Sequence, residues 1–254
     1  MPSPNILKDY FSNAYYHIYN RGINKQDIFK HPDDYEKFID HFKLCLTPVQ
    51  KLIEEKNELI VKKGPTRRIE QLINAINKGL KYRTDKNISL LAYCLMPNHF
   101  HLLVFQKTKD AITILMKRLV TGYTGYFNHK YKRRGPLFES RYKACHFTID
   151  PRIQTLLTCR YIERNPLAAN IININKLHRY PYSSLQFYGN SRKMKPVKPI
   201  WLSTLRLKRI FSKIKQSPNG PIENQIAKKE TYLEFVTGDL LFNTEDVRLV
   251  NMFE

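Results

Sequence analysis

The chain has 254 residues, with 43 Lys and Arg against 22 Asp and Glu, which gives a formal net charge of +21. Hydrophobic residues make up 42% and aromatic residues 12%, enough to bury a core, so the composition excludes a chain that is disordered as a whole. A positive excess of this size indicates a polyanionic partner, and nucleic acid is the first candidate.

Hydropathy and cysteine usage exclude two further classes. The longest apolar runs, such as 88–96, are too short for a membrane helix, and the first nine residues lack a secretory pattern. We therefore expect a soluble, cytoplasmic protein with no membrane partner. Cys45, Cys94, Cys145 and Cys159 show no CxxC spacing, which argues against a zinc knuckle or a disulfide framework and favours buried thiols.

The first half of the chain predicts a strand, a helix and a hairpin. A β-rich run before Gly22 places Tyr15, His17 and Tyr19 on one strand face, and an apolar stripe at helical spacing follows His31. The expected elements are a strand at 14–22, a helix at 31–46, a charged helical pair inserted at 49–86, and two antiparallel strands at 88–95 and 99–105.

The second half predicts two longer helices around a short strand. The expected elements are a helix at 111–131, a strand at 144–148, a helix from 150 to 165 that Pro166 ends, short helices near 201–211 and 232–236, and an acidic tail within 230–254. The order strand, helix, two strands, helix, strand, helix indicates an α+β fold. We expect a ferredoxin-like (RRM-like) antiparallel sheet with helices on one face.

His99 and His101 are the best candidates for metal ligands. Residues i and i+2 of a strand share a face, so both imidazoles project to one side while Phe100 points into the opposite layer. Two imidazoles make half of a metal site, although two ordinary surface histidines would give the same pattern. The other histidines, His17 among them, show no such pairing.

Tyr161 and Asn165 form a second candidate pair. They are one helical turn apart, so the phenol and the amide share a helix face. Such a pair could give a metal site one more oxygen ligand and give phosphoryl chemistry a nucleophile. Tyr19 could also be a nucleophile by its chemistry, but no oxygen ligand accompanies it one turn away on a helix.

A basic stretch with interleaved aromatic residues is the candidate DNA surface. Residues 107–146 carry ten Lys and Arg against two acids, and aromatics among cations suit base stacking beside phosphate contacts. The helical spacing of Tyr123, Tyr126 and Phe127 favours core packing for these three rings. Solvated surface charge explains each single cation equally well. The candidate DNA-binding residues are Arg133, Arg134, Arg141, Tyr142 and Lys143.

Four segments together resemble the HUH single-tyrosine transposases, most closely the REP-associated tyrosine transposase branch and related insertion-sequence transposases. They are 15–29, 95–103 (LMPNHFHLL), 135–143 (GPLFESRYK) and 161–166 (YIERNP). The resemblance runs from about Tyr15 to Tyr188. The charged insertion at about 49–86 and the region from 189 onward depart from the family pattern.

The resemblance implies a metal-dependent DNA strand transferase that cuts and rejoins single-stranded or hairpin DNA through a 5′-phosphotyrosine intermediate. It assigns Mg²⁺ or Mn²⁺ to His99, His101 and Asn165, and the nucleophile to Tyr161. Residues 1–188 would form the catalytic domain, and 189–254 a basic linker with a small helical extension and an acidic tail. Both a monomer and a homodimer are compatible with the sequence.

Two alternatives use the same fold without catalysis. A binding protein for single-stranded DNA or RNA would use the aromatic residues as a stacking platform, and it explains the net charge equally well. It does not explain why a Tyr-x-x-x-Asn pair accompanies the His-x-His strand. A domesticated, inactive transposase that only binds DNA is the other alternative.

Overall fold

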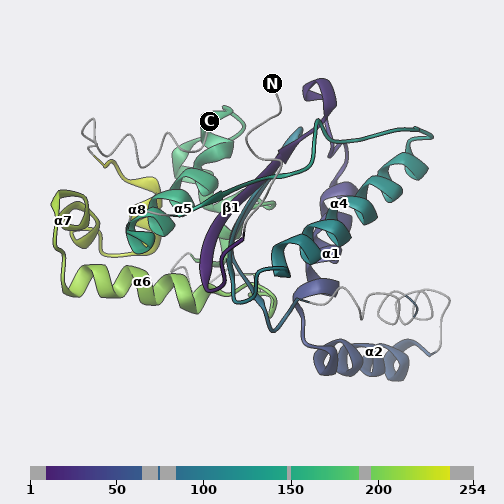
Figure 1. Cartoon of the computed structure of the whole chain (residues 1–254), viewed down its shortest axis with the longest axis horizontal. Coiled ribbons are helices and arrows are strands. Elements are labelled where there is room, and N and C mark those ends of the chain that lie inside the picture. Colours follow the sequence, from purple (N-terminus) through teal and green to yellow (C-terminus); the bar gives the residue numbers. More distant parts are fainter. Residues whose placement is uncertain (1–9, 65–73, 75–83, 148–149, 189–195, 241–254) are drawn as a thin grey trace.

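A four-stranded sheet forms the centre of the molecule. In the computed structural model, which describes residues 10–64, 74, 84–147, 150–188 and 196–240, the strands are β1 (Ala14–Arg21), β2 (Ile88–Met96), β3 (His99–Gln106) and β4 (Lys143–His146). Their order is β2-β3-β1-β4, and every neighbouring pair is antiparallel (Figure 1). The predicted α+β, ferredoxin-like sheet is therefore confirmed, with the His-x-His strand β3 in an inner position.

The helices follow the expected order, except that α7 was not predicted, and they differ from the prediction at their ends. They are α1 (Pro32–Leu46), α2 (Val49–Lys63), α4 (Ala111–Lys130), α5 (Pro151–Ala168), α6 (Thr204–Gln216), α7 (Pro221–Ala227) and α8 (Tyr232–Thr237). The second helix expected within 49–86 falls almost wholly outside the described residues. The same holds for most of the predicted acidic tail.

Helices α1 and α4 cover one face of the sheet, as the sequence predicted (Figure 1). The fully buried Phe38 of α1 packs against both Tyr123 of α4 and Phe100, the residue between the two histidines of β3. Asp34 joins the start of α1 to the end of α4, because its carboxylate accepts hydrogen bonds from Lys130, at 2.8 Å, and from four further groups. This face is a closed core.

Helices also cover the opposite face of the sheet, whereas the sequence predicted helices on one face. Leu103 and Phe105 of β3 belong to a second core cluster with residues of α5, α6, α7 and α8. Figure 1 shows α5 and α6 on the side of the sheet away from α1 and α4. The C-terminal helices therefore share their core with α5, the helix that carries Tyr161.

The charged segment between α1 and β2 begins and ends at neighbouring points. The Thr84 amide donates to the Cys45 carbonyl at 3.0 Å, although the two residues are 39 apart in sequence. Thr84 is buried, and Cys45 lies in the first core cluster. Whatever lies between them, the chain leaves and re-enters the core at one place.

Two expectations from composition concern thiols and membranes. All four cysteines are free; Cys45, Cys94 and Cys159 are buried as predicted, and Cys145 is half-buried. In the part of the chain that the structure describes, no helix is both long and apolar enough to cross a membrane.

Helix α5 is held from behind by the C-terminal helices. Arg160 and Arg164 donate hydrogen bonds to the last carbonyls of α8, including those of Phe235, at 3.1 Å, and Val236, at 2.9 Å. Between them, the fully buried Glu163 accepts from Ser184, at 2.8 Å, and from the Tyr232 hydroxyl, at 2.9 Å. These contacts fix the rotation of α5 about its axis.

The buried Glu163 predicts a pH-dependent stability. Burial raises its pKa to about 8, so between the pKa of the unfolded chain, about 4.3, and about 8 the folded state binds more protons. Stability should therefore fall by a few kcal/mol as the pH rises through this window, and Glu163→Gln should flatten that fall. Urea unfolding midpoints at pH 5.5 and pH 8 for both proteins measure the difference. An equal fall in both would assign the pH dependence to other groups.

Candidate active site

The pairing of β1 with β3 sets the floor of the candidate site. His99 lies opposite Arg21 and His101 lies opposite Tyr19 in the antiparallel register. The two imidazole rings are 5.0 Å apart between centroids and nearly perpendicular. Both project from the sheet face that α5 covers, because alternate strand residues share a face.

Helix α5 brings Tyr161 and Asn165 to the histidines. The ring of Tyr161 lies edge-on to His101, with 5.6 Å between centroids. The Asn165 amide oxygen lies 3.5 Å from Nε2 of His99. The four residues that the sequence singled out for metal binding and nucleophilic attack, from two elements far apart in the chain, therefore lie together.

Pro166 does not end α5, contrary to the sequence prediction, since the helix continues to Ala168. Proline has no N–H for the carbonyl four residues back, which here belongs to Ile162. The side-chain amide of Asn165 substitutes for it, donating to Ile162 at 3.3 Å and to the Tyr161 carbonyl at 3.0 Å. Because the amide nitrogen is held in this way, the oxygen of Asn165 is turned toward His99.

The tautomer of His99 is set by its other neighbour. Nδ1 of His99 lies 2.6 Å from the Asn98 side-chain oxygen, which can only accept, so Nδ1 carries the proton. The lone pair of Nε2 then faces the Asn165 oxygen, which is also an acceptor. Two acceptors 3.5 Å apart have no proton to share, and a cation bound to both would satisfy them.

His17 belongs to the site, although no pairing with another histidine could be predicted for it. Its Nε2 lies 2.9 Å from Nδ1 of His101, and its ring is 5.9 Å from that of Tyr161. His17 is fully buried. Strand alternation predicted that His17 and Tyr19 share a face of β1. Which residues of β3 that face meets depends on the register between the two strands.

Burial keeps the three imidazoles neutral. It lowers the pKa of His17 to about 3 and holds the pKa of His101 well below its usual value. The pKa of His99 is lowered as well, by burial and by the nearby Arg21 charge, against the opposing contact with Asn165. Neutral imidazoles offer a lone pair to a metal ion, so the protonation state suits ligation near neutral pH.

The second phenol near the histidines is that of Tyr19. Its ring stacks on His17, with 5.0 Å between centroids, and lies 5.7 Å from His101. Burial raises its pKa to about 12, with further contributions from Cys145 and Tyr161. A phenol that is harder to deprotonate is the poorer nucleophile at neutral pH, so the raised pKa does not favour Tyr19 as the nucleophile.

The donor set fits a divalent ion of the Mg²⁺ or Mn²⁺ type. Within the described residues no three His, Cys, Asp or Glu side chains are grouped to hold a metal. A set of His99, His101 and the Asn165 oxygen has only two residues of those types and carries no thiolate, which argues against a closed structural zinc site. Two imidazoles and one amide oxygen leave coordination positions open for water and phosphate oxygens.

The contact between His17 and His101 predicts an effect on metal affinity. When Nδ1 of His101 donates to His17, Nε2 of His101 keeps a lone pair for a metal ion. His17 then acts as the hydrogen-bond acceptor that a carboxylate or carbonyl provides for most metal-bound histidines. His17→Phe should weaken Mn²⁺ binding by about 10- to 100-fold, and His17→Gln, which keeps an acceptor, should recover part of it. Calorimetric titration measures both, with Tyr19→Phe as the control. Unchanged affinity in His17→Phe would contradict this role.

The candidate DNA-binding residues divide between the two sides of the sheet. Lys143 of β4 lies opposite Tyr19, and its ammonium sits 5.5 Å from the centre of that ring, so it faces the site. Tyr142, one residue earlier, faces the other way and bonds the Tyr10 hydroxyl at 2.9 Å. Base stacking by Tyr142 beside the histidines therefore has no support from its position.

The three candidate arginines lie in the segment between the end of α4 and the start of β4. Arg133 and Arg134 follow the end of α4, and the Arg133 guanidinium lies 5.7 Å from the ring centre of Phe127. Arg134 and Arg141 are exposed. The sequence analysis missed Arg21, which is paired in register with His99 and forms a 3.3 Å ion pair with Glu139. The exposed Arg21 guanidinium is the cation that lowers the His99 pKa.

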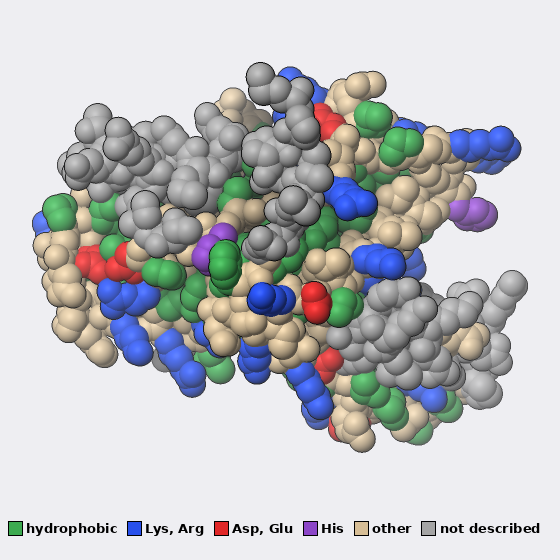
Figure 2. All heavy atoms as spheres, viewed as in Figure 1, with side chains coloured by type: hydrophobic (Ala, Val, Ile, Leu, Met, Phe, Trp, Pro, Cys, Tyr) green, Lys and Arg blue, Asp and Glu red, His purple; other side chains and the backbone are tan. Residues whose placement is uncertain are grey.

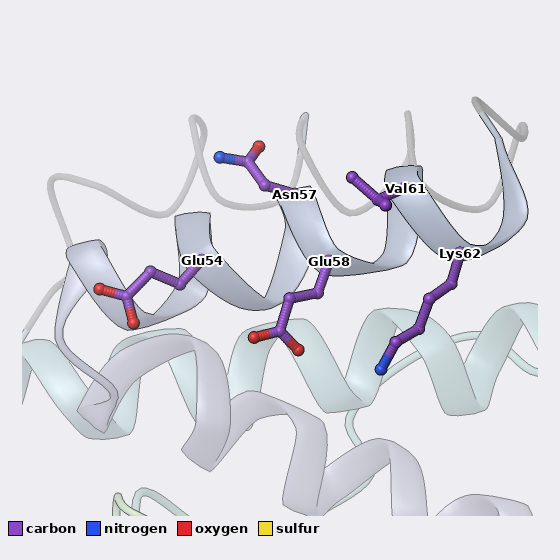
Figure 3. A pocket seen from close by; sticks show the side chains of 5 residues that line it. All are labelled: Glu54, Asn57, Glu58, Val61 and Lys62. Atoms are coloured by element: carbon purple, nitrogen blue, oxygen red, sulfur yellow. The ribbon is translucent and has the colours of Figure 1, made fainter.

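A shallow hollow elsewhere on the molecule is unrelated to this constellation. Figure 3 shows that its lining comes from α2 alone: Glu54, Asn57, Glu58, Val61 and Lys62. It contains neither a histidine nor a tyrosine, and its polar groups have opposite charges. The candidate catalytic residues therefore lie on β1, β3 and α5, away from this hollow.

Comparison with known proteins gives a match to part of the chain. Residues 53–165 match the family model described as "Transposase IS200 like". The match includes β3 and ends at Asn165, so it spans both histidines and the Tyr161–Asn165 pair, while His17 lies outside it. The predicted resemblance to single-tyrosine transposases is therefore confirmed over these residues, and this part of the chain is transposase-like in sequence.

Two further comparisons complete the picture. No curated protein matches the chain. Among solved structures, one that is similar is described as "Structure of the REP associates tyrosine transposase bound to a REP hairpin". It shares 10% sequence identity over 71% of this chain and 82% of that chain, with a TM-score of 0.44.

Proposed function

We propose that the protein is a metal-dependent DNA strand transferase that cuts and rejoins single-stranded or hairpin DNA with Tyr161 as nucleophile. The observation that carries the proposal is the meeting of His99, His101, Tyr161 and Asn165 at one point on the sheet, within the transposase-like part of the sequence. The net charge of +21 supplies the attraction for the polyanionic substrate.

In this proposal the residues have separate tasks. His99, His101 and Asn165 would hold a divalent ion, which would supply Lewis-acid chemistry for the scissile phosphate. His17 orients the imidazole of His101 from behind. Arg21, opposite His99, and Lys143, opposite Tyr19, attract the DNA backbone toward the histidines.

The covalent step conserves one phosphoester bond. The Tyr161 hydroxyl oxygen attacks phosphorus, a new oxygen–phosphorus bond forms, and the bond from phosphorus to the 3′ oxygen breaks. The phenol gives up one proton and the leaving 3′ oxygen takes one up, so no net proton is consumed. Because the energy of the phosphoester is kept, attack by another 3′-OH can rejoin strands without ATP.

A covalent adduct is the direct test of this function. The protein is incubated with a set of hairpin and unpaired oligonucleotides in the presence of Mn²⁺, and the products are separated under denaturing conditions. A 3′ label should move to the protein, while a 5′ label should leave on a shorter fragment with a free 3′-OH. Binding without any adduct on all substrates would instead favour a non-catalytic DNA- or RNA-binding protein.

A further inference from the structure

The C-terminal helix α6 carries an unusual concentration of positive charge. Its 13 residues contain five Lys and Arg and no acid. One side, with Leu207, Ile210 and Ile214, is buried in the second core cluster. The other side is cationic, and Figure 2 shows Lys and Arg side chains gathered over α6, along the lower edge of the view. This arrangement makes α6 a basic ridge on the surface.

The ridge is open to a partner. Lys208, Arg209 and Lys213 are exposed, and none of the ion pairs found among the described residues involves α6. Lys208 and Lys213 are separated by about 7.5 Å along the helix axis, about two base steps of duplex DNA. Cations at this spacing can follow a phosphate backbone.

The start of α6 is connected to the sheet face that carries the candidate site. The Arg206 guanidinium lies 3.8 Å over the ring of Phe105 and bonds the Tyr15 hydroxyl at 3.4 Å. Tyr15 precedes Tyr19 by four strand residues, which is about 13 Å along β1. From there α6 runs away from the sheet toward α7 (Figure 1). DNA held at the histidines therefore needs to extend only a few nucleotides to reach the ridge.

We infer that α6 binds the backbone of a double-stranded segment of the DNA, such as a hairpin stem, beside the cleavage point. The ridge suits a duplex because its exposed side offers cations, Leu205 and Ser212, but no aromatic ring for unpaired bases to stack on. Phe211, the one aromatic residue of α6, is buried. The inference rests on the proposed action on DNA and assigns a role to the region beyond residue 189.

A pair of charge-removing variants tests the ridge. Lys208→Gln with Lys213→Gln is compared with Lys37→Gln with Lys62→Gln, which removes two exposed lysines from α1 and α2. Fluorescence anisotropy measures binding of a hairpin with a stem and of an unpaired oligonucleotide across a salt series. For the α6 variant, the salt slope on the hairpin should fall by about two, and affinity at 50 mM salt by at least tenfold.

Affinity for the unpaired oligonucleotide should stay within about twofold, and the control pair should behave like the parent on both DNAs. An equal loss on both DNAs, an equal loss in the control, or no loss at all would overturn the inference. Equal urea midpoints establish that the fold is kept. The adduct assay on unpaired DNA is read separately: if the parent forms no adduct while the hairpin effect holds, the proposed catalysis fails and the duplex-binding surface stands.

Discussion

Replacing Tyr161 with phenylalanine is expected to abolish the covalent protein–DNA adduct. The substitution removes one oxygen and keeps the ring that lies edge-on to His101, so packing and stability should change little. Mn²⁺ affinity should also be kept, because the proposed ligands are elsewhere. DNA binding should survive, which separates chemistry from recognition. Transfer of a 3′ label to the protein, followed under denaturing conditions, measures the loss.

Tyr19→Phe is the matched control, because its phenol lies beside the same histidines. It should retain adduct formation, with at most a modest change in rate. If Tyr161→Phe still forms the adduct and Tyr19→Phe does not, the nucleophile is Tyr19 on β1. The family resemblance would then have assigned the nucleophile wrongly to α5. If both variants form the adduct, Tyr142 or another tyrosine is the nucleophile.

Removing both imidazoles of the His-x-His pair is expected to eliminate divalent metal binding. His99→Ala with His101→Ala deletes two of three proposed ligands, and the amide oxygen of Asn165 alone should hold Mn²⁺ at least 100-fold more weakly. Adduct formation should disappear with the metal. Calorimetric titration of Mn²⁺ into the parent and the variant measures the first effect, and the oligonucleotide assay measures the second.

Single variants keep this test sharp if the double variant is unstable, since His101 is buried. His99 is half-buried, and His99→Ala should lower Mn²⁺ affinity with little effect on folding. Asn165→Ala should be milder in metal affinity but should also loosen the last turn of α5, because its amide replaces the N–H that Pro166 lacks. Mn²⁺ binding by His99→Ala equal to that of the parent would remove the metal assignment.

Local pattern was enough to predict the parts of the site that lie within one element. Alternation along a strand put His99 and His101 on one face, and helical spacing put Tyr161 and Asn165 on another. Bringing these two pairs together depended on the family resemblance, because nothing in the spacing of one element fixes the position of a distant one. The order of elements also predicted the sheet, in which β3 takes an inner position.

The remaining errors arose where two segments meet. His17 was discounted because its partner is defined only by the β1–β3 register. The orientation of Tyr142 could not be predicted for the same reason, because the pairing of Lys143 with Tyr19 sends Tyr142 to the face away from the histidines. Pro166 was expected to end α5 because proline lacks the backbone N–H that continues a helix. The side-chain amide of Asn165 donates to the Ile162 carbonyl in its place, which sequence spacing did not predict.

The hydrogen bond between Thr84 and Cys45 has a consequence for how this chain tolerates change in length. Since it pins two points 39 residues apart inside the core, adding flexible chain to the span between them lengthens a loop whose ends stay fixed. Doubling or halving such a loop alters the free energy by only about 0.6 kcal/mol. The span is therefore a place where a fluorescent reporter or an additional binding module could be inserted while the histidines, more than ten residues further along, keep their geometry.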